Sequence, residues 1–314
     1  MDVYNLQTMQ REESVSSPLS VALGNFDGVH IGHAELIRRT VEHARARGHA
    51  SAVWTFSDGA GTLPNKPGTP AITTTEEKLT LIGSMGVDYA ILESFSDVRG
   101  LSPDQFVKEL LIKKYHAVCT VCGYNFRFGA GGTGDCDTLC SLMAPHDCIV
   151  VPPVYKGTTP VSSSAVRALL KKGDMEGAWD LLGRPFYINL PVIKGKQLGR
   201  TIGIPTINQS FPEGHIIPMG GIYICSVSAD GEEYMGVANI GTRPTVDNDD
   251  HVLNCETHII DCNKDLYGKN VKVAFHHRLR DEVRFDSIDR LMHQIQCDIE
   301  KTKLYFKGNF KSPK

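Results

Sequence analysis

The sequence lacks long apolar runs and an apolar leader. No run of about 18 consecutive apolar residues occurs along the 314 residues, so we expect no membrane-spanning helix. The first twenty residues carry Arg11, Glu12 and Glu13, where a secretion signal needs an apolar core. We therefore expect a cytoplasmic protein with no membrane partner.

An excess of basic charge is also lacking. The formal net charge is −3, with 22% charged and 41% hydrophobic residues, which is the composition of an ordinary folded protein. Nothing in this composition indicates a nucleic-acid partner. The length allows two ordinary domains or one large domain, and no repeat or low-complexity tract divides it.

Cysteines, by contrast, are present in number. Two of the pairs among the nine cysteines, Cys119 with Cys122 and Cys136 with Cys140, have spacings that metal ligands or redox thiols use. Residues 117–123, however, have the pattern of a buried strand, in which Cys119 and Cys122 point to opposite faces. We therefore predict reduced, structural cysteines.

The most informative stretch runs from Leu23 to His33. It places His30 and His33 around Gly32, between an apolar strand-like run and a helix-like run over 34–47. Imidazoles at the start of a helix meet a phosphate where the backbone N–H groups and the helix dipole already favour negative charge. Gly32 allows close approach to the backbone. This arrangement indicates nucleotide handling.

A simpler interpretation is that His30 and His33 are surface or helix-cap residues. The turn-forming residues Gly24, Asn25 and Gly28 lie in the same short segment between strand and helix. This concentration makes coincidence unattractive and favours a phosphate site.

Strand-like and helix-like segments alternate over the first 180 or so residues. Thr74 and Glu77 form a capping-box pattern before a helix over 78–85 that Gly86 ends, and Ser102 with Gln105 opens a helix that runs toward 114. This alternation predicts a parallel sheet covered on both faces, with ligands at the carboxyl ends of its strands. The predicted strands are 21–25, 50–56, 89–92, 117–123 and 147–151.

After residue 184 the pattern changes to extended, turn-punctuated segments. Asp230-Gly231 is a hairpin signal, and apolar residues at helical spacing from Ile288 to Ile299 predict a closing helix over 287–303. We predict an antiparallel barrel over 185–314, following an α/β domain over 1–184. The predicted strands are 186–193, 222–227, 234–239, 253–260 and 271–279.

A glycine-rich run over 129–134 matches the G-x-G-x-x-G pattern of dinucleotide-binding proteins. The four residues 125–128 separate it from the preceding strand, and the pattern belongs at the first strand-to-helix turn of a unit. We therefore predict a glycine loop that covers a bound ligand.

Three hydroxyls, Ser162, Ser163 and Ser164, stand at a predicted helix start, and Arg167 follows one turn later. Taken alone, the serines are plausible helix caps. Beside the two-histidine segment, the hydroxyls and the guanidinium become candidate ligands for the β- and γ-phosphates of ATP.

In the second half, Gly195, Gly199 and Gly203 recur every four residues among basic residues. A glycine-rich loop with basic residues is suited to phosphate, and no Gly-Lys-Ser/Thr follows, so it is not the familiar P-loop. Thr206 and Asn208, just beyond it, offer oxygen ligands suited to Mg²⁺.

Glu256 lies in an extended segment, where strand alternation puts its carboxylate on one face with His258. A charged residue in a barrel strand usually faces solvent. If that face instead lines the phosphate site, Glu256 is the natural general base for a hydroxyl that attacks a γ-phosphate.

Taken in order, these segments resemble the prokaryotic bifunctional FAD synthetases, in which a riboflavin kinase is fused to an FMN adenylyltransferase. The resemblance covers nearly the whole chain. Its N-terminal motifs are Gly24-Asn-Phe-Asp-Gly-Val-His-Ile-Gly-His33, Gly123-Tyr-Asn-Phe-Arg-Phe-Gly129 and Val161-Ser-Ser-Ser-Ala-Val-Arg167. Its C-terminal motifs are the loop from Gly195 to Asn208, residues 236–245, 256–261 and 265–268, and Leu279-Arg-Asp-Glu282.

The resemblance implies a Rossmann-like nucleotidyltransferase domain of the α/β class followed by a riboflavin kinase-like barrel. In the barrel, the 5′-hydroxyl of riboflavin attacks the γ-phosphate of ATP. Glu256 is then the base, Thr206 and Asn208 hold Mg²⁺, and the loop of Gly195, Gly199 and Gly203 holds phosphates.

In the N-terminal domain, the FMN phosphate attacks the α-phosphorus of a second ATP and expels pyrophosphate. His30 and His33 then stabilise the charge that builds on the phosphates. Riboflavin, FMN, FAD and ATP are thus the expected small-molecule partners, and the oligomeric state is left open. The implied ATP and phosphate ligands are Gly24, Phe26, Gly32, Asn125, Ser162, Ser163, Ser164 and Arg167.

Three positions depart from the family pattern. Pro160 replaces a basic residue, Ser164 replaces a threonine, and residues 58–64 replace a Pro-His-Pro-like stretch. All three lie in the adenylyltransferase half. An alternative is therefore a riboflavin kinase whose inactive N-terminal half is a flavin-binding regulatory module.

The string from His30 to His33 also matches a signature of class I aminoacyl-tRNA synthetases. Their second signature, a Lys-Met-Ser-Lys-Ser loop, is missing, and no basic RNA-binding domain is visible. We therefore prefer the resemblance to the bifunctional FAD synthetases.

Overall fold

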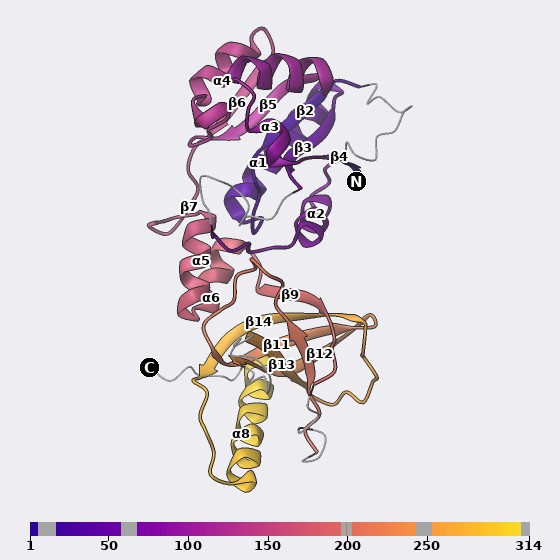
Figure 1. The fold of residues 1–314 in the computed structure, drawn as a ribbon, viewed down its shortest axis with the longest axis vertical. Helices are drawn as coiled ribbons and strands as arrows, with labels where there is room; N and C mark the ends of the chain where they lie inside the picture. The colour runs from indigo at the N-terminus through magenta and orange to yellow at the C-terminus, as the bar shows by residue number, and fades with distance from the viewer. Residues whose placement is uncertain (6–16, 58–67, 196–198, 200–202, 243–252, 309–314) are drawn as a thin grey trace. The chain divides into compact units, whose positions relative to one another are not determined.

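Six parallel strands form a sheet at the centre of the first half of the chain (Figure 1). The computed structural model describes residues 1–5, 17–57, 68–195, 199, 203–242 and 253–308. The chain divides into two units, Met1–Ser163 and Ser164–Lys314. These units and the predicted domains 1–184 and 185–314 group residues 164–184 differently, and the predicted boundary stays a prediction.

The strand order of the first unit is β1-β4-β3-β2-β5-β6, and every neighbouring pair is parallel, which confirms the predicted sheet. β3, β5 and β6 have the predicted bounds. The strands are β1 (Asp2–Asn5), β2 (Leu19–Leu23), β3 (Ala50–Phe56), β4 (Tyr89–Glu93), β5 (Ala117–Gly123) and β6 (Asp147–Val151).

Three strands differ from the prediction. β4 ends one residue beyond the predicted 92. β2 begins and ends two residues earlier than predicted, because Leu19 is already buried and the chain turns sharply at Phe26, whose φ is +53°. β1 is an edge strand of four residues that pairs with β4, and the sequence pattern did not predict it.

Helices cover both faces of this sheet, as predicted (Figure 1). α1 and α2 lie against one face, and η2 and α4 lie against the other. The bounds are α1 (Ile31–Arg47), α2 (Thr75–Gly83), α3 (Phe95–Val98), η2 (Gln105–Lys114), η3 (Ala130–Gly132) and α4 (Cys136–Met143).

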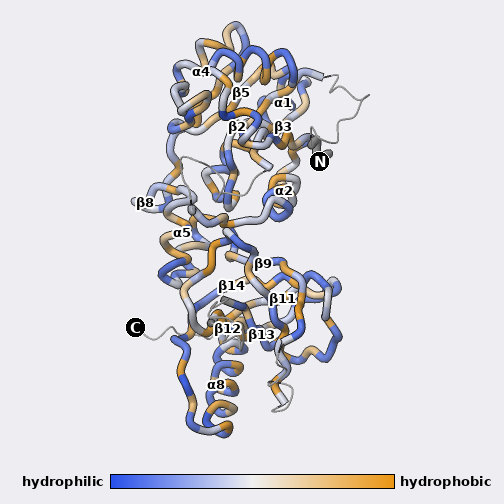
Figure 2. Tube along the Cα trace, in the orientation of Figure 1, coloured by the Kyte–Doolittle hydropathy of each residue, from blue (hydrophilic) through white to orange (hydrophobic). Residues whose placement is uncertain are grey.

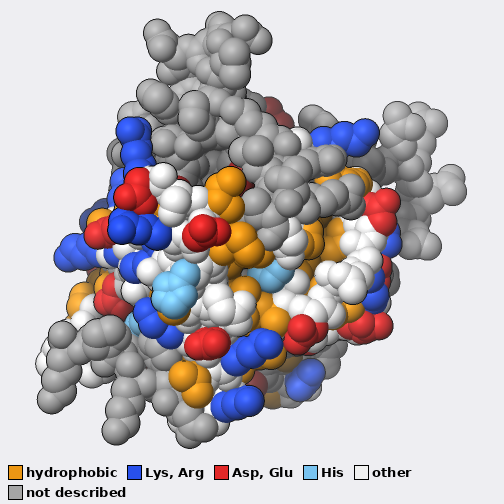
Figure 3. All heavy atoms as spheres, turned by 90° about the horizontal axis from the view of Figure 1, so that it is seen from below, with side chains coloured by type: hydrophobic (Ala, Val, Ile, Leu, Met, Phe, Trp, Pro, Cys, Tyr) orange, Lys and Arg blue, Asp and Glu red, His pale blue; other side chains and the backbone are white. Residues whose placement is uncertain are grey.

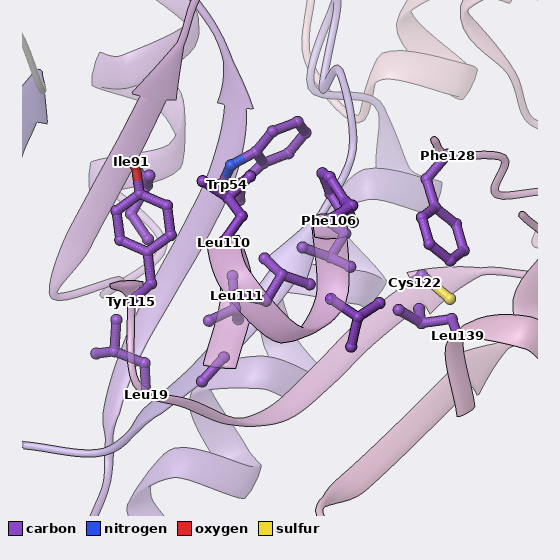
Figure 4. Packing of buried hydrophobic residues seen from close by; sticks show 14 of the residues in the cluster. Leu19, Trp54, Ile91, Phe106, Leu110, Leu111, Tyr115, Cys122, Phe128 and Leu139 are labelled. Carbon is purple, nitrogen blue, oxygen red and sulfur yellow. The ribbon is translucent and has the colours of Figure 1, made fainter. Parts of the chain in front are cut away.

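Successive side chains of β2 enter two separate cores. Val21 belongs to the core beneath η2 and α4, and Ala22 belongs to the core beneath α1 and α2, which is the alternation a strand imposes. Figure 4 shows the first of these cores. There the rings of Trp54 and Phe106 meet edge to face, with centroids 5.2 Å apart.

The helix starts follow the predicted capping residues. Thr74 and Glu77 exchange both bonds of a capping box ahead of α2, which ends at Gly83, before the predicted end at 85. Ser102 and Gln105 exchange the same pair of bonds, at 2.9 and 3.2 Å. The segment they open is a π-helix, whereas the sequence predicts only a helix.

The described cysteines correct one prediction. Cys140 and Cys148 form a disulfide that links α4 to β6, whereas we expect reduced cysteines from the sequence. The sequence could not predict this bond, because the eight-residue separation of Cys140 and Cys148 does not show that α4 packs beside β6. Cys119 and Cys122 are free and buried, and they belong to the cores on opposite faces of the sheet, as predicted.

The second unit is built on six antiparallel strands in the order β10-β13-β12-β11-β14-β9. The two edges approach each other where the Ile193 N–H donates to the Asn208 carbonyl at 2.8 Å, so the sheet curls into the predicted barrel. The strands are β9 (Phe186–Pro191), β10 (Ile207–Ser210), β11 (Gly221–Ala229), β12 (Glu232–Thr242), β13 (Leu253–Ile259) and β14 (Asn270–Arg280).

β11 and β12 form the predicted hairpin, with φ of +51° at Asp230 and +79° at Gly231. Outside the barrel lie short elements of which the sequence predicted only a helix start near 162. They are β7 (Tyr155–Lys156), β8 (Thr159–Pro160), α5 (Ser163–Lys172) and α6 (Met175–Leu182).

The predicted closing helix is confirmed as α8 (Ile288–Phe306). It begins one residue after the predicted 287, with Ser287 as its N-cap, and ends three residues beyond the predicted 303. Hydrophobic and hydrophilic residues alternate along it (Figure 2). Ile299 is buried, but Ile288, predicted on the same apolar stripe, is 61% exposed because only the second half of α8 is buried against the barrel strands.

A buried ion pair fastens α8 to β14. Asp298 is 1% exposed and accepts bonds from the Arg280 guanidinium at 3.0 and 2.8 Å, and from Gln294 Nε2 at 3.0 Å.

The surface of the protein mixes side chains of different kinds. On the face shown in Figure 3, acidic, basic and hydrophobic side chains lie side by side. No helix in the described part of the chain is both long and apolar enough to cross a membrane.

Replacing Asp298 with Ala should lower the free energy of unfolding of the barrel by about 3 kcal/mol, because it leaves the Arg280 charge without its partner in a largely buried place. Urea unfolding followed by circular dichroism measures the change. The control is Asp286→Ala, which removes an exposed ion pair with Arg290 and should cost about 0.5 kcal/mol or less. Equal effects of the two variants would contradict the prediction.

Candidate functional site

His30 and His33 lie at the start of α1, directly after β2. The backbone of His30 is extended, and its Nδ1 accepts the His33 N–H at 3.1 Å, so His30 is the N-cap of α1. The two rings stack with centroids 3.6 Å apart and planes inclined by 11°. The cap interpretation therefore holds for His30. It is compatible with phosphate binding, because the capping bond occupies Nδ1 and not Nε2.

The glycines of this turn make room for aromatic rings. A Cβ on Gly32 would lie 3.2 Å from the His30 ring, and a Cβ on Gly24 would lie 3.1 Å from the Phe26 ring. Phe26 is fully buried, and its ring centroid lies 5.1 Å from that of His33. Close approach of a phosphate to Gly32 stays a prediction.

Asp27 ties this turn to two other segments, a role that the sequence analysis missed. Its Oδ1 accepts from the N–H groups of Ile72 and Thr73 at 2.9 and 3.3 Å, and the Gly28 N–H donates to Thr73 Oγ1 at 3.1 Å. Ser163 Oγ donates to the Asp27 carbonyl at 2.9 Å. The structure thus brings Ser163 to the turn that holds the histidines.

Lys78 is a second residue that the sequence analysis missed, since only its position in a helix was predicted. It is 5% exposed, and its Nζ donates to the Phe56 carbonyl at 2.8 Å and to Thr55 Oγ1 at 3.1 Å. Its Nζ also lies 3.4 Å from the Asn25 carbonyl. This buried cation fixes the chain where β2 and β3 end.

The strand order reverses between β2 and β5, because β3 and β4 lie beyond β2 whereas β6 lies beyond β5. Ligands of open parallel sheets bind at the carboxyl ends of the strands at such a reversal. His30 and His33 follow β2, and Asn125 follows β5 and is exposed. These predicted residues therefore lie at the edge of the sheet where a nucleotide is expected.

The remaining predicted residues of this half lie around the start of α5. Ser162 is half-buried, Ser164 is exposed and Arg167 is 9% exposed. α5 begins at Ser163, so the serines stand at a helix N-terminus as predicted.

Backbone hydrogen bonds hold the glycine loop, both within itself and to the segment between α3 and η2. The Ala130 N–H donates to the Leu101 carbonyl at 2.7 Å, and Phe128 and Gly134 exchange two backbone bonds at 3.1 and 2.9 Å. That this loop covers a ligand stays a prediction.

In the barrel, three polar residues share one row across adjacent strands. Glu256 on β13 is in register with Asn208 on β10 and with Asn239 on β12, so the three side chains project from the same face. Asn208 is 6% exposed, and its Oδ1 has no hydrogen-bond partner in the described residues. Asn239 Nδ2 donates to Glu282 Oε1 at 2.7 Å, and its Oδ1 is likewise unpaired within the described part of the chain.

Two of the predicted glycines fit against this row and its loop. A Cβ on Gly195 would lie 2.6 Å from Asn208 Nδ2, and a Cβ on Gly199 would lie 2.2 Å from the Ile204 carbonyl oxygen. Gly203 has φ of +75° and open space around it. The basic neighbours Lys196 and Arg200 lie outside the described residues.

His258 secures the next part of the loop. Its Nδ1 lies 2.9 Å from the Pro205 carbonyl, directly before Thr206. Pro205 and Thr206 also line a cavity of about 90 Å³. Its other lining residues are Val192, Ile207, Ile259, Cys262, Lys264, Asp265, Leu266 and Tyr267.

Known proteins match the chain over both halves. Residues 12–165 match the FAD synthetase family, and residues 182–306 match the riboflavin kinase family. A bifunctional riboflavin kinase/FMN adenylyltransferase of Bacillus subtilis (strain 168) is 34% identical over 303 residues, which cover 94% of each chain. The protein of that name from Escherichia coli (strain K12) is 35% identical and covers 97% of this chain and 96% of its own.

The chain belongs to the bifunctional riboflavin kinase/FMN adenylyltransferase family. A crystal structure from Streptococcus pneumoniae, described as a macrolide-efflux protein, shares its fold. That structure has a TM-score of 0.82 and 31% identity, and the match covers 92% of this chain and 94% of that one.

Within the bifunctional riboflavin kinase/FMN adenylyltransferase family, the departures of this chain fall at exposed or undescribed positions. Pro160 is exposed in β8, which pairs with β7 in a two-stranded hairpin. Ser164 is exposed in the first turn of α5. Residues 58–64 lie outside the described residues. Pro160 and Ser164, the two described departures, therefore lie outside the cores of the units.

Proposed function

We propose that this chain phosphorylates riboflavin to FMN in the barrel, predicted as residues 185–314, and adenylylates FMN to FAD in the N-terminal domain, predicted as residues 1–184. The observation that carries the proposal is the match, over more than nine-tenths of the chain, to relatives that are named for both activities. A cytoplasmic location stays a prediction from the sequence.

For the kinase step, the row on β10, β13 and β12 supports Glu256 as the general base. Its carboxylate accepts the proton of the riboflavin 5′-hydroxyl as that oxygen attacks the γ-phosphorus of ATP, and ADP leaves. The loop of Gly195, Gly199 and Gly203 binds the phosphates through backbone N–H groups. We place the part of ATP that adjoins these phosphates in the cavity beside Thr206.

Mg²⁺ fits the oxygen atoms that this loop offers. Asn208 Oδ1 is buried and has no protein partner among the described residues, and an amide oxygen and a hydroxyl are ligands that Mg²⁺ accepts. We therefore propose that Asn208 and Thr206 hold the ion, which when bound would neutralise charge on the ATP phosphates. His258 positions Thr206 through the Pro205 carbonyl.

For the adenylyl step, the FMN phosphate attacks the α-phosphorus of ATP and pyrophosphate leaves. His30 and His33 stabilise the negative charge that builds on the phosphate oxygens, assisted by the N-terminal dipole of α1. Gly24, Phe26, Gly32 and Asn125 shape the nucleotide site at the strand ends. Ser162, Ser163, Ser164 and Arg167 are the proposed ligands of the departing phosphates.

One incubation tests both activities. The full chain is mixed with riboflavin, ATP and Mg²⁺, and FMN and FAD are separated by chromatography. Accumulation of FAD supports the bifunctional proposal. FMN alone supports the second candidate, a kinase with an inactive flavin-binding N-terminal half, which the exposed Pro160 in place of a cation favours. Neither product would overturn both.

Replacing Asn208 with Ala should raise the Mg²⁺ concentration needed for half-maximal FMN formation by roughly tenfold or more, since losing even an indirect partner of a metal costs roughly that much. Titration of Mg²⁺ at saturating ATP measures the shift. The exposed Asn270→Ala is the control, and the Mg²⁺ dependence of FAD formation from supplied FMN should not move. An unchanged titration for Asn208→Ala would remove Asn208 from the metal site.

A further inference from the structure

Four cysteines lie where α4 packs on one face of the N-terminal sheet, two on the helix and two on the strands. Cys122 on β5 and Cys148 on β6 share this face, because Cys148 is in register with Thr120, two residues before Cys122. Cys136 and Cys140 are one helical turn apart on α4. Cys140 and Cys148 already form a disulfide. The other two cysteines, Cys122 and Cys136, form a second pair that has no disulfide bond.

The sulfur atoms of this second pair lie 3.9 Å apart. Cys136 Sγ also donates toward the Gly123 and Tyr124 carbonyls, at 3.3 and 3.4 Å. In Figure 4 the Cys122 sulfur points toward Leu139 of α4 in the core. We propose that Cys122 and Cys136 are a peroxide-sensitive dithiol that closes to a disulfide and thereby alters the loop between β5 and α4.

The two thiols have different exposures, which fixes the order of the steps. Cys136 is half-buried and meets solvent, whereas Cys122 is fully buried. Burial first, and then the neighbouring Cys136 sulfur, raise the pKa of the Cys122 thiol, so it stays protonated at neutral pH. Peroxide therefore reaches Cys136 first, and Cys122 is the resolving thiol.

The reaction balances with hydrogen peroxide as the oxidant. Peroxide transfers one oxygen to Cys136, giving a sulfenic acid and one water. The Cys122 sulfur then attacks the Cys136 sulfur, the S–OH bond breaks, and a second water leaves with the Cys122 proton. The two thiols lose two electrons, which reduce peroxide to water. A dithiol reductant reverses the change.

Closing this bond must move the two sulfur atoms. A disulfide needs its sulfurs about 2.05 Å apart, so the pair must approach by roughly 2 Å from its 3.9 Å separation. Cys136 also gives up its bonds to the Gly123 and Tyr124 carbonyls, directly before Asn125. Both ends of the loop over 124–135 are then tied together. The oxidised loop presents Asn125 and the glycine run in a changed position.

Mass spectrometry tests the bond without reference to activity. The full chain is treated with hydrogen peroxide, free thiols are alkylated, and the protein is cut with trypsin without reduction. We expect the peptides 115–127 and 128–156 to be joined, with Cys140–Cys148 intact. Cys136→Ser should abolish the joined product and Cys119→Ser should keep it. Unlinked peptides with alkylated or sulfinic Cys136, or a product that depends on Cys119, would overturn the proposal.

Activity tests the consequence, and this readout rests on the proposed adenylyl transfer. Peroxide should lower FAD formation from supplied FMN by roughly tenfold, since a misplacement of about 1 Å in a positioning residue can cost even more. FMN formation should stay constant, and dithiothreitol should restore the loss. Cys136→Ser should not respond to either treatment. An equal loss in Cys136→Ser, or no loss in a wild-type chain that carries the linked peptides, would overturn the effect on the loop. A chain that makes no FAD before treatment instead contradicts the proposed function alone.

Discussion

Replacing Glu256 with Gln should lower FMN formation from riboflavin and ATP by roughly 10²–10⁴-fold, the usual contribution of a general base. Gln keeps the size of the side chain and its place in the row between Asn208 and Asn239, but it cannot accept the hydroxyl proton. Conversion of supplied FMN to FAD should continue at the original rate. Steady-state assays with each flavin as substrate separate the two effects.

The control for this variant is Glu213→Gln, which changes an exposed carboxylate of the same unit and should leave both rates alone. The fold of Glu256→Gln can be checked by urea unfolding. A folded Glu256→Gln protein that still makes FMN at the wild-type rate would exclude Glu256 as the base. The row would then have only a binding role.

Replacing His33 with Ala should lower FAD formation by roughly 10²–10³-fold, the cost of losing one group that stabilises transition-state charge. FMN formation should be unaffected, because the kinase residues all lie on the barrel. The rate of FAD formation from FMN and ATP measures the loss. If the folded variant instead lost FMN formation, the proposed division of the two reactions would be wrong.

His30 needs a different substitution, since its side chain also caps α1. Asn is among the strongest N-cap residues, so His30→Asn removes the imidazole and its stacking on His33 while keeping an acceptor for the His33 N–H. We expect His30→Asn to lose FAD formation while its free energy of unfolding stays that of the wild-type chain. The matched control is the exposed His116→Asn, whose φ of +51° Asn tolerates.

The elements that the sequence predicts well are those with strong periodicity. β5 over 117–123 and the capping box at Thr74 and Glu77 follow directly from alternation and from hydrogen-bonding chemistry, and both are confirmed. β10 is the opposite case. It has four residues, follows a proline, and owes its strand conformation to pairing with β13, which no local pattern reveals.

The sequence predicts individual residues of the candidate site but not the contacts between them. The motif residues His30, Asn208 and Glu256 were found from residue type and spacing. The pairing of Asn208 with Glu256 depends on strand register, and the bonds from Asp27 to Ile72 and Thr73 join segments about 45 positions apart. Such contacts are set by the tertiary fold, so one sequence read locally does not contain them.

The cysteines and α8 show the same limit. The spacing of Cys136 and Cys140 drew attention to that pair, but the disulfide joins Cys140 to Cys148, because β6 lies beside α4. Ile288 has the spacing of a core residue but is exposed, because periodicity defines a face of a helix and not the length over which that face is covered.

Position 208 performs two tasks with different atoms. Its backbone carbonyl joins the barrel edges through Ile193, and every amino acid supplies a carbonyl. Its side-chain oxygen serves the proposed metal, and only the polar and acidic side chains that carry an oxygen atom supply one. The two constraints are therefore separable in evolution and in protein engineering. A family member can exchange the chemistry of residue 208 while the seam of its barrel stays closed.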